Sequence, residues 1–285
     1  MDWISRQFPT RVVALLPVAI AINIVLGATV QQALKLPIYL DSIGTILVGV
    51  LAGPLAGLVT GVLSNLIWGY LLPAPIGSTT IGPFAIVAGV IGLLAGLWGR
   101  MGLFRDRSGE TSGSSIGGAV VALGLVAVLA FYTYTRAYAD PETYASTTFF
   151  DPATFDQSRI LFLVVMAAFV GLIAWSLFLR RDLGAVYAVA SGLVTGIAAA
   201  IVSAPISAIV FGGVTGGGTD LLVAAFRAGG ASLLEATLQQ GLLADPLDKM
   251  VTSFVVFFVL ANLSRRVVAR FPNGERLLGR GASTE

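Results

Sequence analysis

Apolar runs recur along this chain, and as helices most of them would be about as long as a bilayer is thick. This pattern restricts the chain to few classes of fold. A helix needs roughly 20 apolar residues to cross the hydrocarbon core of a membrane. Of the 285 residues, 56% are hydrophobic and 11% are charged, whereas soluble domains carry about 25% charged residues. We therefore expect an all-α integral membrane protein, a polytopic helical bundle that forms a single transmembrane domain over residues 1–285.

The apolar runs predict eight spans. The second run is short and ends at Gly53-Pro54, a dipeptide that stops helices, so it is either a complete or a partial crossing. The first run contains Pro17 and Asn23 and lacks a small-residue cleavage site, which favours a span over a cleaved signal. The predicted spans are residues 12–33, 39–52, 54–72, 79–99, 116–135, 160–180, 183–211 and 247–264.

Basic residues are distributed unevenly between the two sides that these spans define. With the amino terminus inside, twelve of the 17 lysines and arginines fall in inside segments. Cytoplasmic segments are rich in Lys and Arg, so we expect a protein of the cell inner (plasma) membrane with both termini and the loop 100–115 in the cytoplasm. The segments 136–159 and 212–246 then lie outside, where either could act as a lid.

The residue types present exclude several classes of chemistry. The chain has no cysteine and no histidine, so it lacks thiolate nucleophiles, imidazole bases and the commonest soft-metal ligands. No stretch matches the phosphate-binding GxxxxGK[ST] motif, and the few carboxylates do not group with a nucleophile. We therefore expect no enzyme activity, no metal and no cofactor. The arginines are spread over membrane boundaries, which is not the pattern of a nucleic-acid interface.

Polar residues at membrane depth indicate a site, because burying them unpaired costs on the order of several kcal/mol. Asn65 lies one helical turn before Trp68, near the outer end of the third predicted span. An amide and an indole could together bind a flat polar ring, by hydrogen bonding and by stacking. Trp68 also fits a belt of aromatic residues at the membrane interface. Asp41 begins the second span close to Tyr39, and it is either a helix cap or a partner for a cationic substrate.

A glycine-rich segment follows the seventh predicted span, in the stretch SAPISAIVFGGVTGGGTD at residues 203–220. Glycines let the backbone approach a ligand closely, but they also occur in plain flexible loops. Further along, Asp248 and Lys249 stand at the start of the last span, where a charge pair can anchor a helix at the interface. We predict a substrate-binding site on the outer side that consists of Tyr39, Asp41, Asn65, Trp68, Gly216, Gly217 and Asp220.

Small residues recur at helical spacing in several of the predicted spans. Such stripes let helix backbones approach closely in lipid, so they predict helix contacts. The stripes are Gly53, Gly57 and Gly61, then Gly92 and Gly96, and then Gly192 and Gly196.

Two parts of the sequence resemble the substrate-binding S component of energy-coupling factor (ECF) transporters, which import vitamins and other micronutrients. The first is YLDSIGTILVGVLAGPLAGLVTGVLSNLIWG at residues 39–69, and the second is APISAIVFGGVTGGGTD at 204–220 together with DPLDK at 245–249. The resemblance implies a pocket that is open to the outside and capped by loops. It also implies three partners, namely a transmembrane coupling protein and two ATPase subunits.

Members of this family resemble six-helix bundles, so the resemblance implies a core of about 12–99 and 183–264, an inserted hairpin of about 116–180 and a short cytoplasmic tail, 265–285. The function that follows is the membrane-embedded substrate-binding subunit of an ECF-type importer for a vitamin or a related small heterocyclic micronutrient. Its expected partners besides the ECF subunits are the small-molecule substrate and the lipid bilayer. A membrane sensory protein and a non-transporting accessory subunit of a larger membrane complex are the alternatives.

Overall fold

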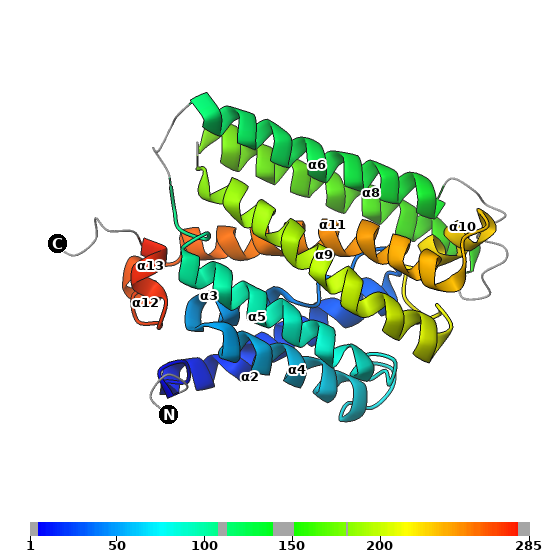
Figure 1. Cartoon of the computed structure of the whole chain (residues 1–285), viewed down its shortest axis with the longest axis horizontal. Helices are drawn as coiled ribbons and strands as arrows, with labels where there is room; N and C mark the ends of the chain where they lie inside the picture. Colours follow the sequence, from blue (N-terminus) through cyan, green and yellow to red (C-terminus); the bar gives the residue numbers. More distant parts are fainter. Residues whose placement is uncertain (1–4, 108–112, 139–150, 181, 279–285) are drawn as a thin grey trace.

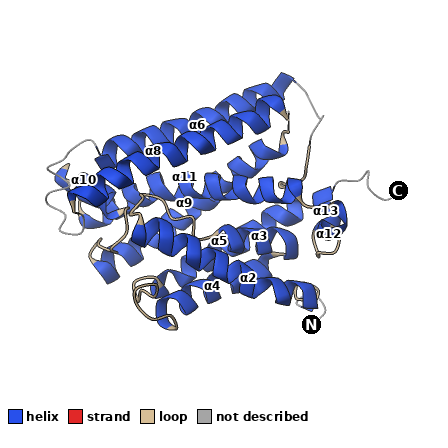
Figure 2. Cartoon of the chain, turned by 180° about the vertical axis from the view of Figure 1, so that it is seen from behind, coloured by secondary structure: helices blue, strands red, loops and turns tan. Residues whose placement is uncertain are grey.

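The computed structural model describes residues 5–107, 113–138, 151–180 and 182–278, and within these ranges every regular element is a helix. The helices run side by side along one long axis, and the loops gather at the two ends of the bundle (Figures 1 and 2). The elements are α2 (Thr10–Gly27), η1 (Ala28–Ala33), α3 (Ile43–Ala52), α4 (Pro54–Tyr70), η2 (Gly82–Phe84), α5 (Ala85–Met101), α6 (Gly113–Tyr138), α8 (Pro152–Ala174), η3 (Trp175–Leu179), α9 (Gly184–Phe211), α10 (Asp220–Ala228), α11 (Leu233–Asn262), α12 (Arg265–Val268) and α13 (Gly274–Leu278).

Five helical segments of the described chain are long and apolar enough to cross a membrane, which confirms a helical membrane protein. They correspond to the first, fourth, fifth, sixth and seventh predicted spans. Their limits are Thr10–Ala33, Gly82–Met101, Gly117–Tyr138, Pro152–Leu179 and Gly184–Phe211.

The other three predicted spans correspond to α3, α4 and α11, which differ from a simple crossing helix. The helix α3 has 10 residues, and at about 1.5 Å per residue it is roughly half as long as the hydrocarbon core is thick. The helix α4 has 17 residues. The helix α11 is long, but it carries Asp245, Asp248 and Lys249 in its middle. The prediction of eight uniform spans is therefore only partly confirmed.

The last helix begins much earlier than predicted. The sequence places residues 212–246 in an outside loop, but the structure has α10 in this segment and starts α11 at Leu233. A capping box begins α11: the Ser232 hydroxyl accepts from the Glu235 backbone N–H, and the Glu235 carboxylate accepts from the Ser232 N–H. Such boxes satisfy helix-end donors and fix where a helix starts.

Both ends of the described chain lie at one end of the bundle, and α10 lies at the other (Figure 1). The loops 71–81 and 212–219 share the end with α10. The helices α6 and α8 pair along one edge, with α9 and α11 next to them (Figure 1). In the predicted outer segment 136–159, α6 continues to Tyr138 and α8 starts at Pro152, while residues 139–150 lie outside the described residues.

Glycines set the closest helix contacts, as the small-residue stripes predict. A methyl group added at Gly92 of α5 would lie 2.1 Å from the carbonyl oxygen of Gly57 on α4. The same addition at Gly192 of α9 would lie 2.3 Å from the carbonyl oxygen of Lys249 on α11. Packing of this kind holds helices together in lipid, where the hydrophobic effect between helices is weak.

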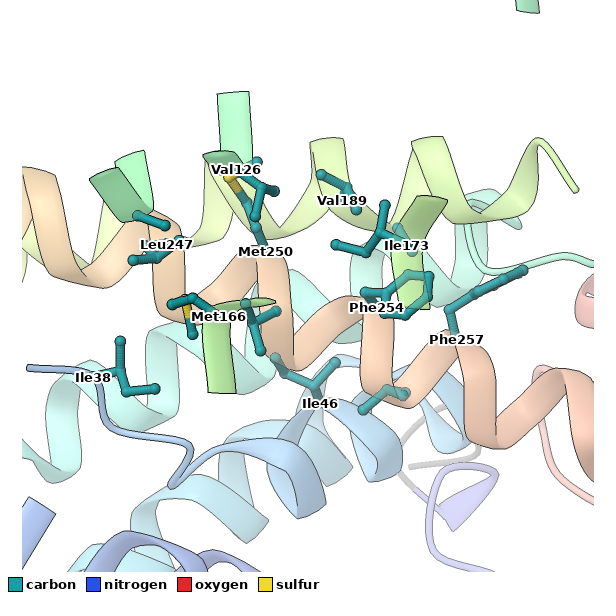
Figure 3. Packing of buried hydrophobic residues seen from close by; sticks show 14 of the residues in the cluster. Ile38, Ile46, Val126, Met166, Ile173, Val189, Leu247, Met250, Phe254 and Phe257 are labelled. Atoms are coloured by element: carbon teal, nitrogen blue, oxygen red, sulfur yellow. The ribbon is translucent and has the colours of Figure 1, made fainter. Parts of the chain in front are cut away.

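The apolar core is centred on α11. Its side chains Leu247, Met250, Phe254 and Phe257 meet residues of α3, α6, α8 and α9 (Figure 3). A smaller polar contact lies among α2, α3 and α4, where the Asn23 side chain satisfies three partners at 2.7–2.9 Å: the hydroxyls of Thr45 and Ser64 and the N–H of Gly44. Asn23 is therefore a structural residue that joins three helices.

We expect Gly92→Ala to lower the thermal unfolding midpoint of the purified protein, since overpacking of a tight contact costs about 1–3 kcal/mol. The matched control is Gly124→Ala on α6, because a methyl group there meets nothing within 4 Å among the described residues. The control should keep or slightly raise the midpoint, as alanine favours helices over glycine. Equal midpoints for the two variants would contradict the close contact of α4 with α5.

Candidate functional site

A cavity of about 360 Å³ lies among the loops and helix ends at the end of the bundle away from the termini (Figure 1). Its walls come from segments far apart in the sequence: the segment that follows α2, the C-terminal part of α4, the start of α5, the end of α9, the glycine-rich loop and the middle of α11. The polar lining includes amides, hydroxyls, carboxylates and two lysines, and the apolar lining comes from α5 and from the segment that precedes it.

Six of the seven predicted site residues line this cavity, and the structure therefore brings together residues from separate segments of the chain. They are Tyr39, Asp41, Asn65, Gly216, Gly217 and Asp220.

The seventh predicted residue, Trp68, does not line the cavity. Its ring is fully buried against Ile20 and Ile24 of α2. Its indole Nε1 donates to the carbonyl oxygen of Ile76 at 2.7 Å, so the loop after α4 satisfies its polar atom. Trp68 is thus a packing residue that anchors this loop, and it neither faces the cavity nor belongs to an exposed aromatic belt.

A buried charge cluster forms the deepest part of the lining. The ammonium group of Lys249, which is 2% exposed, donates to Asp248 Oδ2 at 2.5 Å, Ser42 Oγ at 2.8 Å and Asp41 Oδ1 at 3.4 Å. It also lies 5.7 Å from the centre of the Tyr39 ring. Asp248 and Lys249 are therefore core residues in the middle of α11, and the prediction that they anchor a helix mouth is wrong.

Asp248 fixes the chain segment that precedes α3. Its Oδ1 accepts from the backbone N–H groups of Tyr39 at 3.0 Å and Leu40 at 2.7 Å. Leu40 has a φ of 53°, a left-handed conformation that is strained for a bulky residue. The carboxylate of α11 thereby stabilises an unfavourable turn, and this turn places Tyr39 and Asp41 on the cavity wall.

Asp41 makes side-chain contacts across the bundle rather than capping α3. Its Oδ2 accepts from Gln31 Nε2 at 3.1 Å, and its Oδ1 faces Lys249. The first turn of α3 has no side-chain cap. Of the two roles that the sequence leaves open for Asp41, the helix cap is therefore excluded.

The glycine-rich loop folds back on Asp220. The Asp220 carboxylate accepts from the backbone N–H groups of Thr215 and Gly216 and from the Thr215 hydroxyl, at 2.7–3.1 Å. Burial raises the pKa of Asp220, although these hydrogen bonds oppose the rise. The Lys35 ammonium donates to the Gly216 carbonyl oxygen, and burial lowers the pKa of Lys35. Asp220 and Lys35 therefore hold the loop in place.

Two further predicted residues, Asn65 and Tyr39, line the cavity and make few hydrogen bonds with the described residues. Asn65 is 6% exposed, and among the described residues its Nδ2 reaches only the Ile81 carbonyl oxygen, at 3.5 Å. The Tyr39 hydroxyl accepts from Gln240 Nε2 at 2.8 Å. Both side chains are positioned by the fold and present polar atoms to a small molecule.

Several lining residues were not predicted from the sequence. They include Gln31 on η1, Ser203 and Ser207 on α9, and Asp245 and Gln240 on α11. The signal that could have found the last two is the capping box at Ser232, because it places residues 233–246 in a helix. Gln240, Asp245 and Lys249 then fall on neighbouring turns of one helix.

We expect Lys249→Met to destabilise the protein strongly, since removing one partner of a buried ion pair costs about 3–5 kcal/mol. Chemical or thermal unfolding of the purified variants measures the change. The double variant Lys249→Met with Asp248→Asn should recover part of the loss, because the introduced amide is neutral and still offers an oxygen to the N–H groups of Tyr39 and Leu40. Wild-type stability of the single variant would contradict the role of this pair.

Comparison of the chain with protein families, with curated proteins and with solved structures found no match in any of the three.

Proposed function

We propose that this chain is the membrane-embedded substrate-binding subunit of an importer for a vitamin or a related small heterocyclic micronutrient, energised by separate ATPase subunits as in ECF transporters. The observation that carries the proposal is the cavity of about 360 Å³, which is lined by six of the seven residues that the sequence singles out. A pocket of this size with convergent polar groups and an apolar wall is typical of a small-ligand site.

The lining suits a flat heterocycle. Phe84 and Tyr39 bring aromatic rings to the cavity, and Phe84 is held by stacking on Phe211, with ring centroids 5.7 Å apart. Asn65, Gln31 and Gln240 supply amides. Aromatic faces stack on planar rings, while amides pair with ring nitrogens and their substituents.

The arrangement of helices supports a division into a core and an added hairpin. We propose that α2, α3, α4, α5, α9 and α11 form a six-helix core and that α6 and α8 are the hairpin, which pairs along one edge of the bundle (Figure 1). In this proposal the termini are cytoplasmic, the cavity opens to the outside, and a transmembrane coupling protein with two ATPases drives import. The distribution of arginines supports this orientation.

Small molecules released from the denatured wild-type protein test the binding function. We expect mass spectrometry to find one organic molecule enriched over empty membrane discs, and Asn65→Ala to release several-fold less of it, since a lost hydrogen bond weakens binding by about 0.5–1.5 kcal/mol. The control is Asn262→Ala at the C-terminal end of α11, where the amide is exposed and, within the described part of the chain, bonds only to Phe258. Equal release from Asn65→Ala and wild type would count against the site.

Cysteine labelling tests the orientation, because the native chain has no cysteine. We expect Thr79→Cys, exposed in the loop after α4, to react with a membrane-impermeant maleimide in intact cells. Ser264→Cys, exposed before α12, should react only after the membrane is permeabilised. The reverse pattern would place the cavity on the cytoplasmic side and exclude uptake from outside through it.

A further inference from the structure

Several buried oxygen atoms of the cavity lining have few hydrogen-bond donors within the protein. Ser207 is 6% exposed and lines the cavity, and its hydroxyl makes no hydrogen bond within the described ranges. Asp245 is 5% exposed, and among the described residues only Ser203 Oγ bonds to it, at Oδ2 over 3.2 Å. Gln31 and Gln240 both use their NH₂ groups as donors to protein atoms, so their carbonyl oxygens remain available. These four side chains therefore leave more acceptor positions than donor positions unused.

The charges around Lys249 show the same imbalance. An ammonium group has three N–H donors, and those of Lys249 are directed at Asp248, Ser42 and Asp41. Asp245 lies one helical turn before Lys249 on α11. Three carboxylates therefore surround one ammonium group, and none of the ammonium N–H groups donates a hydrogen bond to Asp245. The second lysine of the lining, Lys35, donates a hydrogen bond to the glycine-rich loop and interacts electrostatically with Asp220.

The opposite wall of the cavity has a different chemistry. Phe84, Val87, Ala88 and Ile91, at the start of α5 and just before it, line it with apolar groups. An apolar wall offers no ligand atoms to a bare metal ion. An organic molecule, in contrast, buries apolar ring surface against such a wall, which favours binding. One end of the occupant must therefore be rich in N–H donors and the rest apolar.

We propose that the cavity binds an organic cation, whose protonated nitrogen donates to Asp245 and Ser207 and whose flat apolar body lies against α5. This assignment rests on the proposed binding function and adds the charge and donor pattern of the substrate. Asp245 selects the charge, because a desolvated carboxylate that makes no direct ion pair gains most from a cation with N–H donors. Lys249 does not compete for this position, since its donors are already used.

Three probes of nearly equal shape test which ligand charge the cavity prefers. They are benzamidine, which is a cation at neutral pH, neutral benzamide and anionic benzoate. Titration calorimetry with the purified full chain in lipid discs measures their affinities. We expect benzamidine to bind at least about tenfold more tightly than benzamide, as charge-assisted hydrogen bonds are the stronger ones. Benzoate should bind least. Equal or tighter binding of benzamide or benzoate would overturn the assignment.

The variant Asp245→Asn tests the residue. It keeps the shape of the side chain and removes one of three neighbouring carboxylates, so we expect an unfolding midpoint no lower than that of the wild type. The preference for benzamidine over benzamide should fall to about one, by loss of the charge-assisted bond. Asp156→Asn makes the same change at a side chain that is 61% exposed on α8 and should keep the preference. Persistence of the preference in Asp245→Asn would overturn the assignment.

The molecule released from the wild-type protein separates this assignment from the proposed function. A basic nitrogen in that molecule supports both. A neutral or acidic molecule whose release depends on Asn65 would overturn the cation assignment and leave the binding function intact. Failure of all three probes to bind, together with no enriched molecule, would overturn both.

Discussion

The ion pair of Lys249 with Asp248 is the interaction on which the site depends. It is buried in the middle of α11, and it contacts a segment more than 200 residues earlier in the chain. Through Asp248 it holds the strained turn at Leu40, and through Lys249 it holds Ser42 and Asp41. The helix α3 has 10 residues, roughly half of what a membrane crossing needs, and this pair fixes where the helix begins.

The cavity lies where two closely packed groups of helices meet. The helices α3, α4 and α5 approach one another at glycines, and α9 meets α11 in the same way. A hydrogen bond from Trp98 Nε1 of α5 to Thr195 Oγ1 of α9, at 2.9 Å, joins the two groups near the end of α5 that is away from the cavity. Because each group is tightly packed, the side chains at their boundary are held in place, and the space left between them is defined by the fold.

The sequence was sufficient for the helical membrane class and for six of the cavity residues, because both depend on local signals: apolar runs, and polar or glycine residues at unusual depth. It was insufficient for α11 and Trp68. In the sequence, the charged residues Asp245, Asp248 and Lys249 have the pattern of a helix end at the membrane surface. Their contacts with Asp41 and Ser42 depend on tertiary packing, which the local sequence does not specify. Likewise, whether an indole faces a ligand or α2 depends on where the neighbouring helix lies.

The hairpin α6–α8 reaches the loop that lines the cavity. Ser158 of α8 donates to the carbonyl oxygen of Lys35 at 2.8 Å, and its hydroxyl also bonds to that of Tyr138 at the end of α6. The other end of Lys35 holds the glycine-rich loop. Any movement of residues 34–42 that widens the cavity must therefore carry α8 along or break this hydrogen bond. The two helices along the edge of the bundle are thus coupled, through this hydrogen bond, to the segment that forms one wall of the cavity.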